Sequence, residues 1–196
     1  SYSSVLQGSE LNNPDRAWNP RELLAYGIAS PRLNPPGAAF ADSDTNYLIA
    51  GLAAERATGE TLSDLIRERV AEPLGLSNTS LPGSAAAAPS STALEGFRSQ
   101  QLPEGGWTCD QPQDVTVTSS SYGGAAAGAV TDITDLGRYT QALAAGSLLP
   151  EGSDRFSSPL PVGADDPTWF TAAGGAYQAG SLIGQFGATA GYMVGS

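Results

Sequence analysis

The pattern of apolar and polar positions predicts two helices in the first third of the chain. Asn19 can cap a helix and Pro20 fits the first helical turn, so we expect a helix that starts there and stops before Pro31. Tyr47–Arg56 is apolar nearly all round, which is typical of a buried helix rather than a surface helix. Gly59 follows it and suits the left-handed residue that often ends a helix.

Two further helices are predicted to be amphipathic. Thr61 suits the cap of the first, while Thr131 suits the cap of the second and Gly146 its end. The expected inward positions are Leu62, Leu65, Ile66 and Val70 in the first helix, and Ile133, Leu136, Thr140 and Leu143 in the second. Each helix therefore needs a neighbour that covers its apolar face.

Strand signals are weaker and lie mostly near the end of the chain. Residues 81–122 are rich in Ala, Ser, Pro and Gly and are predicted to be mostly loop, with an exposed segment at Ala85–Ala88 and a short strand at Val115–Thr118. Ala176–Leu182 and Thr189–Val194 have the pattern of strands. We expect one domain over residues 1–196. Its parts are a helical region at 18–80, a loop-rich region at 81–122, a helix within 123–146 and a strand region at 170–196.

The charge of the chain excludes several partners and reactions. The net charge is -11 and the pI is about 4.2, so the chain lacks the basic face that nucleic acid or an anionic membrane surface requires. All nine basic residues are arginine, and the chain contains neither Lys nor His. A Ser-His-Asp relay, a Schiff-base lysine and a Ser-x-x-Lys nucleophile therefore have no complete set of members within these residues.

The sequence predicts no metal site and no cofactor. Cys109 is the single cysteine, so no internal disulfide forms, and without a basic neighbour in the sequence we expect it to be a buried, inert thiol. No apolar run reaches the length of a membrane span, and residue 1 does not open a signal peptide. These features fit an extracytoplasmic domain, whether secreted, periplasmic or the ectodomain of a lipoprotein.

Four blocks in order give the chain a resemblance to a known family. They are Pro36–Gly51, Glu72–Leu76 with Asn78–Thr79, Gly128–Thr131 with Asp135–Leu136, and Gly187–Tyr192. With these blocks the chain resembles the serine β-lactamase and D-Ala-D-Ala carboxypeptidase family, especially its class C-like, penicillin-recognising branch. The resemblance implies an α/β fold of the β-lactamase/transpeptidase type. This chain would supply mostly the helical region plus a partial antiparallel sheet, incomplete at both ends and completed by a partner chain or another segment.

The resemblance also implies three catalytic motifs, and each departs from the family pattern. The Ser-x-x-Lys nucleophile is expected upstream of residue 1. The Tyr-x-Asn motif falls on Asp42 and Asp44, and the Lys/His-x-Gly motif falls on Gln185 and Gly187. A carboxylate differs in reach and charge from a phenol that shuttles protons, and Gln185 brings no cation to a substrate carboxylate. The changes disfavour recognition of D-Ala-D-Ala ends and of penicillin carboxylates.

The Asp42–Asn46 segment has three interpretations. The first is a changed Tyr-x-Asn loop in which Asp44 or Thr45 caps the helix that follows. Shifted by one residue, Ser43-Asp44-Thr45 approximates the Ser-Asp-Asn motif of class A β-lactamases. Asp-x-Asp-x-Asn also begins a calcium loop, although Tyr47 and Ala53 stand where that loop needs Gly and Glu.

Three functions follow from these interpretations. The favoured hypothesis is a catalytically degenerate family member that serves in cell-envelope binding or scaffolding, with a cell-wall peptide or another envelope protein as its partner. The alternative is one part of an active serine hydrolase (a β-lactamase, a D-Ala-D-Ala carboxypeptidase or an esterase) whose Ser-x-x-Lys lies outside these residues. A third is a protein-interaction module that reuses the helical scaffold.

Overall fold

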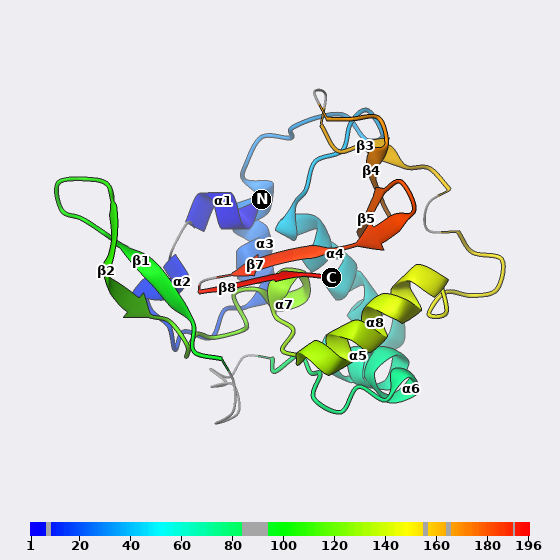
Figure 1. Ribbon diagram of the computed structural model, residues 1–196, viewed down its shortest axis with the longest axis horizontal. Coiled ribbons are helices and arrows are strands. Elements are labelled where there is room, and N and C mark those ends of the chain that lie inside the picture. Colours follow the sequence, from blue (N-terminus) through cyan, green and yellow to red (C-terminus); the bar gives the residue numbers. More distant parts are fainter. Residues whose placement is uncertain (7–8, 84–93, 155–156, 164–165, 190) are drawn as a thin grey trace.

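The computed structural model describes residues 1–6, 9–83, 94–154, 157–163, 166–189 and 191–196 (Figure 1). It combines helices with antiparallel strands. The Ala85–Ala88 segment lies outside the described residues. Within them, no helix is long and apolar enough to cross a membrane.

Helices from the first half of the chain enclose its apolar centre together with α7. Tyr2, Trp18, Leu23 and Leu48 are buried against one another, and Tyr122 meets the first two rings edge-on at centroid distances of 5.6 and 5.5 Å. The helices are α1 (Tyr2–Leu6), α3 (Pro20–Ile28), α4 (Asp44–Thr58) and α7 (Gly124–Ala127); the short helix α2 (Ser9–Asn12) follows α1 in the chain. The core therefore joins residues that are more than a hundred positions apart in the sequence.

The start of α3 is as predicted, whereas the burial of α4 is not. The Asn19 side chain accepts a hydrogen bond from the Arg21 N–H at 2.8 Å, which confirms the predicted cap. In α4, only Thr45, Leu48 and Gly51 are buried, and Ile49 is 47% exposed. The prediction of a helix buried all round was wrong because, among the described elements, α1, α3, α5 and α7 contact α4 and cover only part of its surface.

A second helical group consists of α5 (Leu62–Ile66), the π-helical turn η1 (Arg67–Ala71), α6 (Glu72–Leu74) and α8 (Ile133–Ala145). Thr61 caps α5 as predicted, since its hydroxyl accepts a hydrogen bond from the Asp64 N–H at 3.2 Å. Gly146 ends α8 with φ 66°, also as predicted. The predicted cap of α8 was one residue early, because the carboxylate of Asp132, not Thr131, accepts from the Asp135 N–H.

The buried face of α8 also differs from the prediction. Ile133 is 81% exposed, whereas Asp135, Ala142 and Leu143 are buried. The reason is a set of polar contacts to Asp135 from the loop that follows α6, including the Asn78 N–H at 2.7 Å. These contacts turn a carboxylate inward at a position that the apolar pattern alone assigns to the surface.

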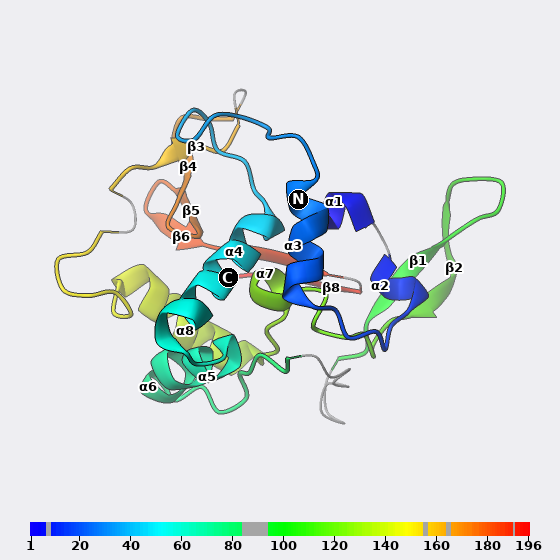
Figure 2. The same cartoon turned by 180° about the vertical axis from the view of Figure 1, so that it is seen from behind.

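A hairpin of β1 (Phe97–Gln101) and β2 (Trp107–Asp114) lies within the region predicted to be mostly loop. It extends away from the helices in both views (Figures 1 and 2). Its loop turns through Gly105 and Gly106, whose φ angles are 93° and 90°. The short strand predicted at Val115–Thr118 is absent from that described segment, which directly follows β2, and Cys109 on β2 is exposed rather than buried.

Two antiparallel sheets complete the described chain. The first has the order β3 (Leu160–Pro161), β4 (Phe170–Ala173), β5 (Ala176–Ala179) and β6 (Leu182–Gly184). The second is the ribbon of β7 (Phe186–Thr189) and β8 (Tyr192–Gly195), which lies in front of α4 and α7 in Figure 1 and behind them in Figure 2. The strand predicted at 176–182 is thus β5 and the turn into β6, and the strand predicted at 189–194 overlaps β8.

Candidate functional site

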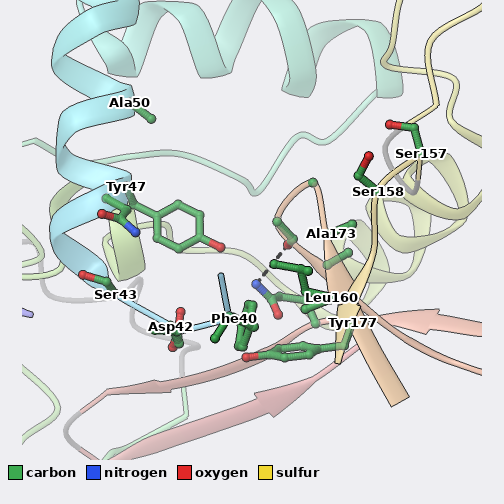
Figure 3. Close-up of a pocket in the computed structure, with 18 residues that line it drawn as sticks. Phe40, Asp42, Ser43, Tyr47, Ala50, Ser157, Ser158, Leu160, Ala173 and Tyr177 are labelled. Carbon is green, nitrogen blue, oxygen red and sulfur yellow. Dashed lines mark hydrogen bonds between the residues drawn. The ribbon is translucent and has the colours of Figure 1, made fainter. Parts of the chain in front are cut away.

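A cavity of about 590 Å³ lies between the start of α4 and the β3–β4–β5 sheet (Figure 3). Its size falls within the range of pockets that hold small molecules. The walls come from four places in the sequence. They are the loop and first turns of α4 at 39–50, the segment at 157–160, the β4–β5 hairpin at 172–177, and Gln185.

The structure places the two candidate carboxylates differently. Asp42 is exposed and lines the cavity, in the loop that enters α4. Asp44 is the first residue of α4 and accepts a hydrogen bond from the Ser1 hydroxyl at 3.1 Å, away from the lining residues. Neither Asp44 nor Thr45 caps the helix through its side chain, because Ser43 is the N-cap residue and makes no side-chain cap bond.

Gln185 lies on the same cavity as Asp42, although 143 positions separate them in the sequence. Its amide Nε2 donates to the Gly175 carbonyl at 3.1 Å, and its Oε1 accepts from the Phe186 N–H at 3.1 Å. These bonds fix the side chain between the β4–β5 hairpin and the start of β7. Gly187 does not line the cavity. It lies on β7 opposite Val194, where an added Cβ would come within 3.1 Å of the valine side chain.

Two tyrosines that the motif argument did not assign to the site also line the cavity. Tyr47 projects its ring from α4 into the space, and Tyr177 from β5 lies across the cavity from it (Figure 3). Burial raises the pKa of Tyr47, the charges of Asp42 and Asp44 raise it further, and a hydrogen bond with Gln185 acts in the opposite direction. Burial, followed by Asp42 and Tyr47, raises the pKa of Tyr177 as well.

The sequence carried a signal for Tyr47 but a poor one for the remaining lining residues. Tyr47 stands three positions after Asp44, so one helical turn brings it near the start of α4. Tyr177, Ser157 and Ser158 come from segments whose position depends on how the sheet packs, and no local pattern marks them.

The chemistry of the lining is acidic and aromatic. Among the lining residues that the structure describes, Asp42 is the only formally charged one, and none is an arginine. No group of three or more Cys, Asp or Glu residues that could hold a metal ion occurs among the described residues. A phenol with a raised pKa stays protonated at neutral pH, so Tyr47 can donate a hydrogen bond but is a poor proton acceptor.

Comparison with known proteins gives a consistent match. The family model described as Beta-lactamase matches residues 1–193. Among solved structures, a D-stereospecific amidohydrolase from Streptomyces sp. matches with a TM-score of 0.81 at 22% identity, over 98% of this chain and 56% of that chain. A D-amino acid amidase from Ochrobactrum anthropi SV3 in complex with D-phenylalanine matches with a TM-score of 0.68 at 22% identity, over 91% and 53%.

A third solved structure, a penicillin binding protein from Bacillus halodurans, matches with a TM-score of 0.57 at 17% identity, over 95% of this chain and 56% of that chain. This chain therefore spans a little more than half the length of the three structures. The likeness confirms the predicted β-lactamase/transpeptidase-like α/β fold, of which the chain covers a part.

Proposed function

The chain belongs to the beta-lactamase family, and from this premise we propose that it is a member that binds a ligand in the cavity without hydrolysing it. The ligand is a cell-wall peptide or an exposed segment of another envelope protein, and the protein acts outside the cytoplasm. Residues 1–196 contribute one β-lactamase-like domain to this role.

One observation carries the proposal. Two residues that depart from the family's catalytic pattern in separate motifs, Asp42 and Gln185, line the same cavity. A family enzyme needs a proton shuttle from the Tyr-x-Asn motif and a cation or imidazole from the Lys/His-x-Gly motif. In this chain the Tyr-x-Asn position supplies the carboxylate of Asp42. The Lys/His-x-Gly position supplies the neutral amide of Gln185, whose nitrogen and oxygen each bond to a backbone group.

The state of Tyr47 supports the same reading. Tyr47 carries the same phenol as the family tyrosine whose position is occupied here by Asp42. The pKa of this phenol is raised by burial and by the charge of Asp42. General-base catalysis works best when the pKa of the base lies near the operating pH. A phenol that holds its proton more tightly than usual suits ligand binding by hydrogen bonding better than proton abstraction.

The alternative is that these residues form part of an active serine hydrolase whose Ser-x-x-Lys comes from residues outside this chain. One observation favours it: two of the similar solved structures are an amidohydrolase and an amidase. In that case the acidic cavity would serve a different substrate from the carboxylate-bearing ligands of penicillin-recognising enzymes.

Hydrolysis assays on the full-length gene product separate the two proposals. We expect no turnover of a D-amino acid amide, a D-Ala-D-Ala peptide or a simple thioester, under conditions in which an active member of the family hydrolyses them. Turnover that falls sharply in both Asp42→Asn and Gln185→Ala variants would refute the binding proposal and establish the hydrolase. Turnover unaffected by both variants would place the reaction at another site and would equally refute the assignment of this cavity.

A further inference from the structure

The walls of the cavity include three aromatic rings around one carboxylate. Phe40 and Tyr177 meet edge-on at a centroid distance of 5.9 Å, and Tyr177 also stacks on Phe170 at 5.7 Å with an interplanar angle of 22°. Contacts with both phenylalanines hold the Tyr177 ring in place. Tyr47 faces Tyr177 across the cavity, and Asp42 lies beside Phe40 (Figure 3).

The electrostatic character of this space favours a positive guest. Within the described part of the chain, Asp42 is the one formally charged lining residue, and its charge adds to the effect of burial in raising the pKa of both Tyr47 and Tyr177. Burial is the larger cause of each raised pKa, and the negative charge of Asp42 adds to it. An anionic ligand meets the same field, whereas a cation is attracted by the carboxylate and by the faces of the rings.

The polar atoms of the lining suit an ammonium group. The Asp42 carboxylate accepts hydrogen bonds, and the Ser43 hydroxyl lies on the same wall of the cavity, whereas Ser157 and Ser158 line the opposite wall (Figure 3). An ammonium group carries three donors and no acceptor, so a carboxylate that only accepts hydrogen bonds is a matched partner for it. A metal ion fits less well, because the described residues hold no group of three or more acidic or thiol ligands.

We propose that the cavity binds a primary ammonium group carried on an apolar or aromatic body, with the ammonium beside Asp42 and the body between Tyr47 and Tyr177. The proposal rests on the proposed binding function and names the class of ligand. The partner presents a free amine, such as the amino end or a diamino-acid side chain of an envelope peptide. Its carboxylate end, which penicillin-recognising enzymes hold, does not enter the cavity.

A series of three ligands with one skeleton and different charge tests the proposal on the full-length protein. Benzylammonium, benzyl alcohol and benzoate are titrated, and binding is measured by calorimetry and by ligand-observed NMR. Because Asp42 is exposed, its pairing with the ammonium resembles a surface ion pair. We therefore expect benzylammonium to bind about fivefold more tightly than benzyl alcohol, with benzoate weakest.

Two matched variants locate the effect. Asp42→Asn removes the carboxylate that lines the cavity and is expected to abolish the roughly fivefold preference for benzylammonium. Asp110→Asn removes the same charge from the exposed side of the β1–β2 hairpin and is expected to leave the preference unchanged. A Tyr177→Leu variant, which loses the ring face, is expected to weaken benzylammonium more than benzyl alcohol. Circular dichroism establishes that each variant is folded.

The outcomes are decisive for the ligand class and independent of hydrolysis. Equal binding of the three ligands, a preference for benzoate, or an equal response of Asp42→Asn and Asp110→Asn would overturn the amine site. Hydrolytic turnover by the same protein would overturn the proposed function. It would not decide the amine site, which the three titrations test independently.

Discussion

Replacing Asp135 with alanine should destabilise the protein more than any other single change to a charged residue of α8. The side chain is 1% exposed. Its Oδ2 accepts hydrogen bonds from the Asn78 N–H at 2.7 Å and from the Thr79 hydroxyl at 3.1 Å, and its Oδ1 accepts from Arg138 at 3.4 Å. One carboxylate thereby joins α8 to the loop that follows α6.

The size of the loss follows from these bonds. A hydrogen bond to a charged group contributes about 1.5–3 kcal/mol, and a buried donor left without a partner costs about 1–3 kcal/mol. The bond from Arg138 adds little, because its side chain is 52% exposed. Asn78 is itself exposed, so water can reach part of the loop once the carboxylate is gone. We therefore expect the free energy of unfolding to fall by about 2–4 kcal/mol, a large share of a typical total of about 5–15 kcal/mol.

Equilibrium unfolding in urea, followed by tryptophan fluorescence and circular dichroism, measures this loss. The Asp135→Asn variant keeps one acceptor oxygen without the charge and should lose less than Asp135→Ala. The Asp132→Ala variant removes the cap of α8 and a bond from the Asn78 side chain, but its carboxylate is only partly buried, so it should also lose less. If Asp135→Ala costs under about 1 kcal/mol, or no more than Asp132→Ala, the reasoning about this buried carboxylate is refuted.

Three other predictions concern titration and packing. The pKa of Tyr47 is raised in the folded state, so this phenol makes its full contribution to the free energy of unfolding below the unfolded pKa of 10.0. That contribution is lost as the pH rises through the folded pKa, and Tyr47→Phe should flatten the loss in alkaline unfolding curves. Because hydrogen bonds from the backbone of α8 lower the pKa of Asp132, stability should fall as pH drops below the unfolded value of 3.8, and less so in Asp132→Asn. Gly51→Ala should lower the free energy of unfolding by about 1–3 kcal/mol, because the new Cβ would approach the Ala125 Cβ of α7 to 2.9 Å. Gly137→Ala, which has open space around it in α8, should raise the free energy of unfolding by about 0.5–1 kcal/mol; thermal or urea unfolding measures both. Equal effects of the two glycine changes would contradict the close packing of α4 on α7.

The helix ends could be predicted because their signals are local. Asn19 and Thr61 bond to backbone groups two or three residues away, and Gly59 and Gly146 adopt the positive φ that glycine permits. The burial of Asp135 could not be predicted in this way, because its partner Asn78 lies 57 positions away. The β1–β2 hairpin was missed for another reason: its strands are mostly polar and exposed, so they lack the alternation that marks a half-buried strand.

The candidate site, too, could be predicted only in part from the sequence. The family frame around Asp42 and Gln185 pointed to two positions far apart in the sequence, and the structure places both on one cavity. The order of motifs carries that information, because relatives conserve the fold that brings them together. Tyr177 and the two serines at 157 and 158 belong to the cavity through the packing of the β4–β5 hairpin, which no spacing in the sequence encodes.

The most direct test of the account is the intact mass of the full-length gene product after incubation with a fluorescent penicillin. We expect no covalent adduct, because Asp42 repels a carboxylate and replaces the phenol that shuttles protons, and Gln185 brings no cation to hold a carboxylate. An active family member treated in parallel shows that the reagent acylates under the same conditions. An adduct of one penicillin per protein, lost in the Gln185→Ala variant, would contradict the central claim.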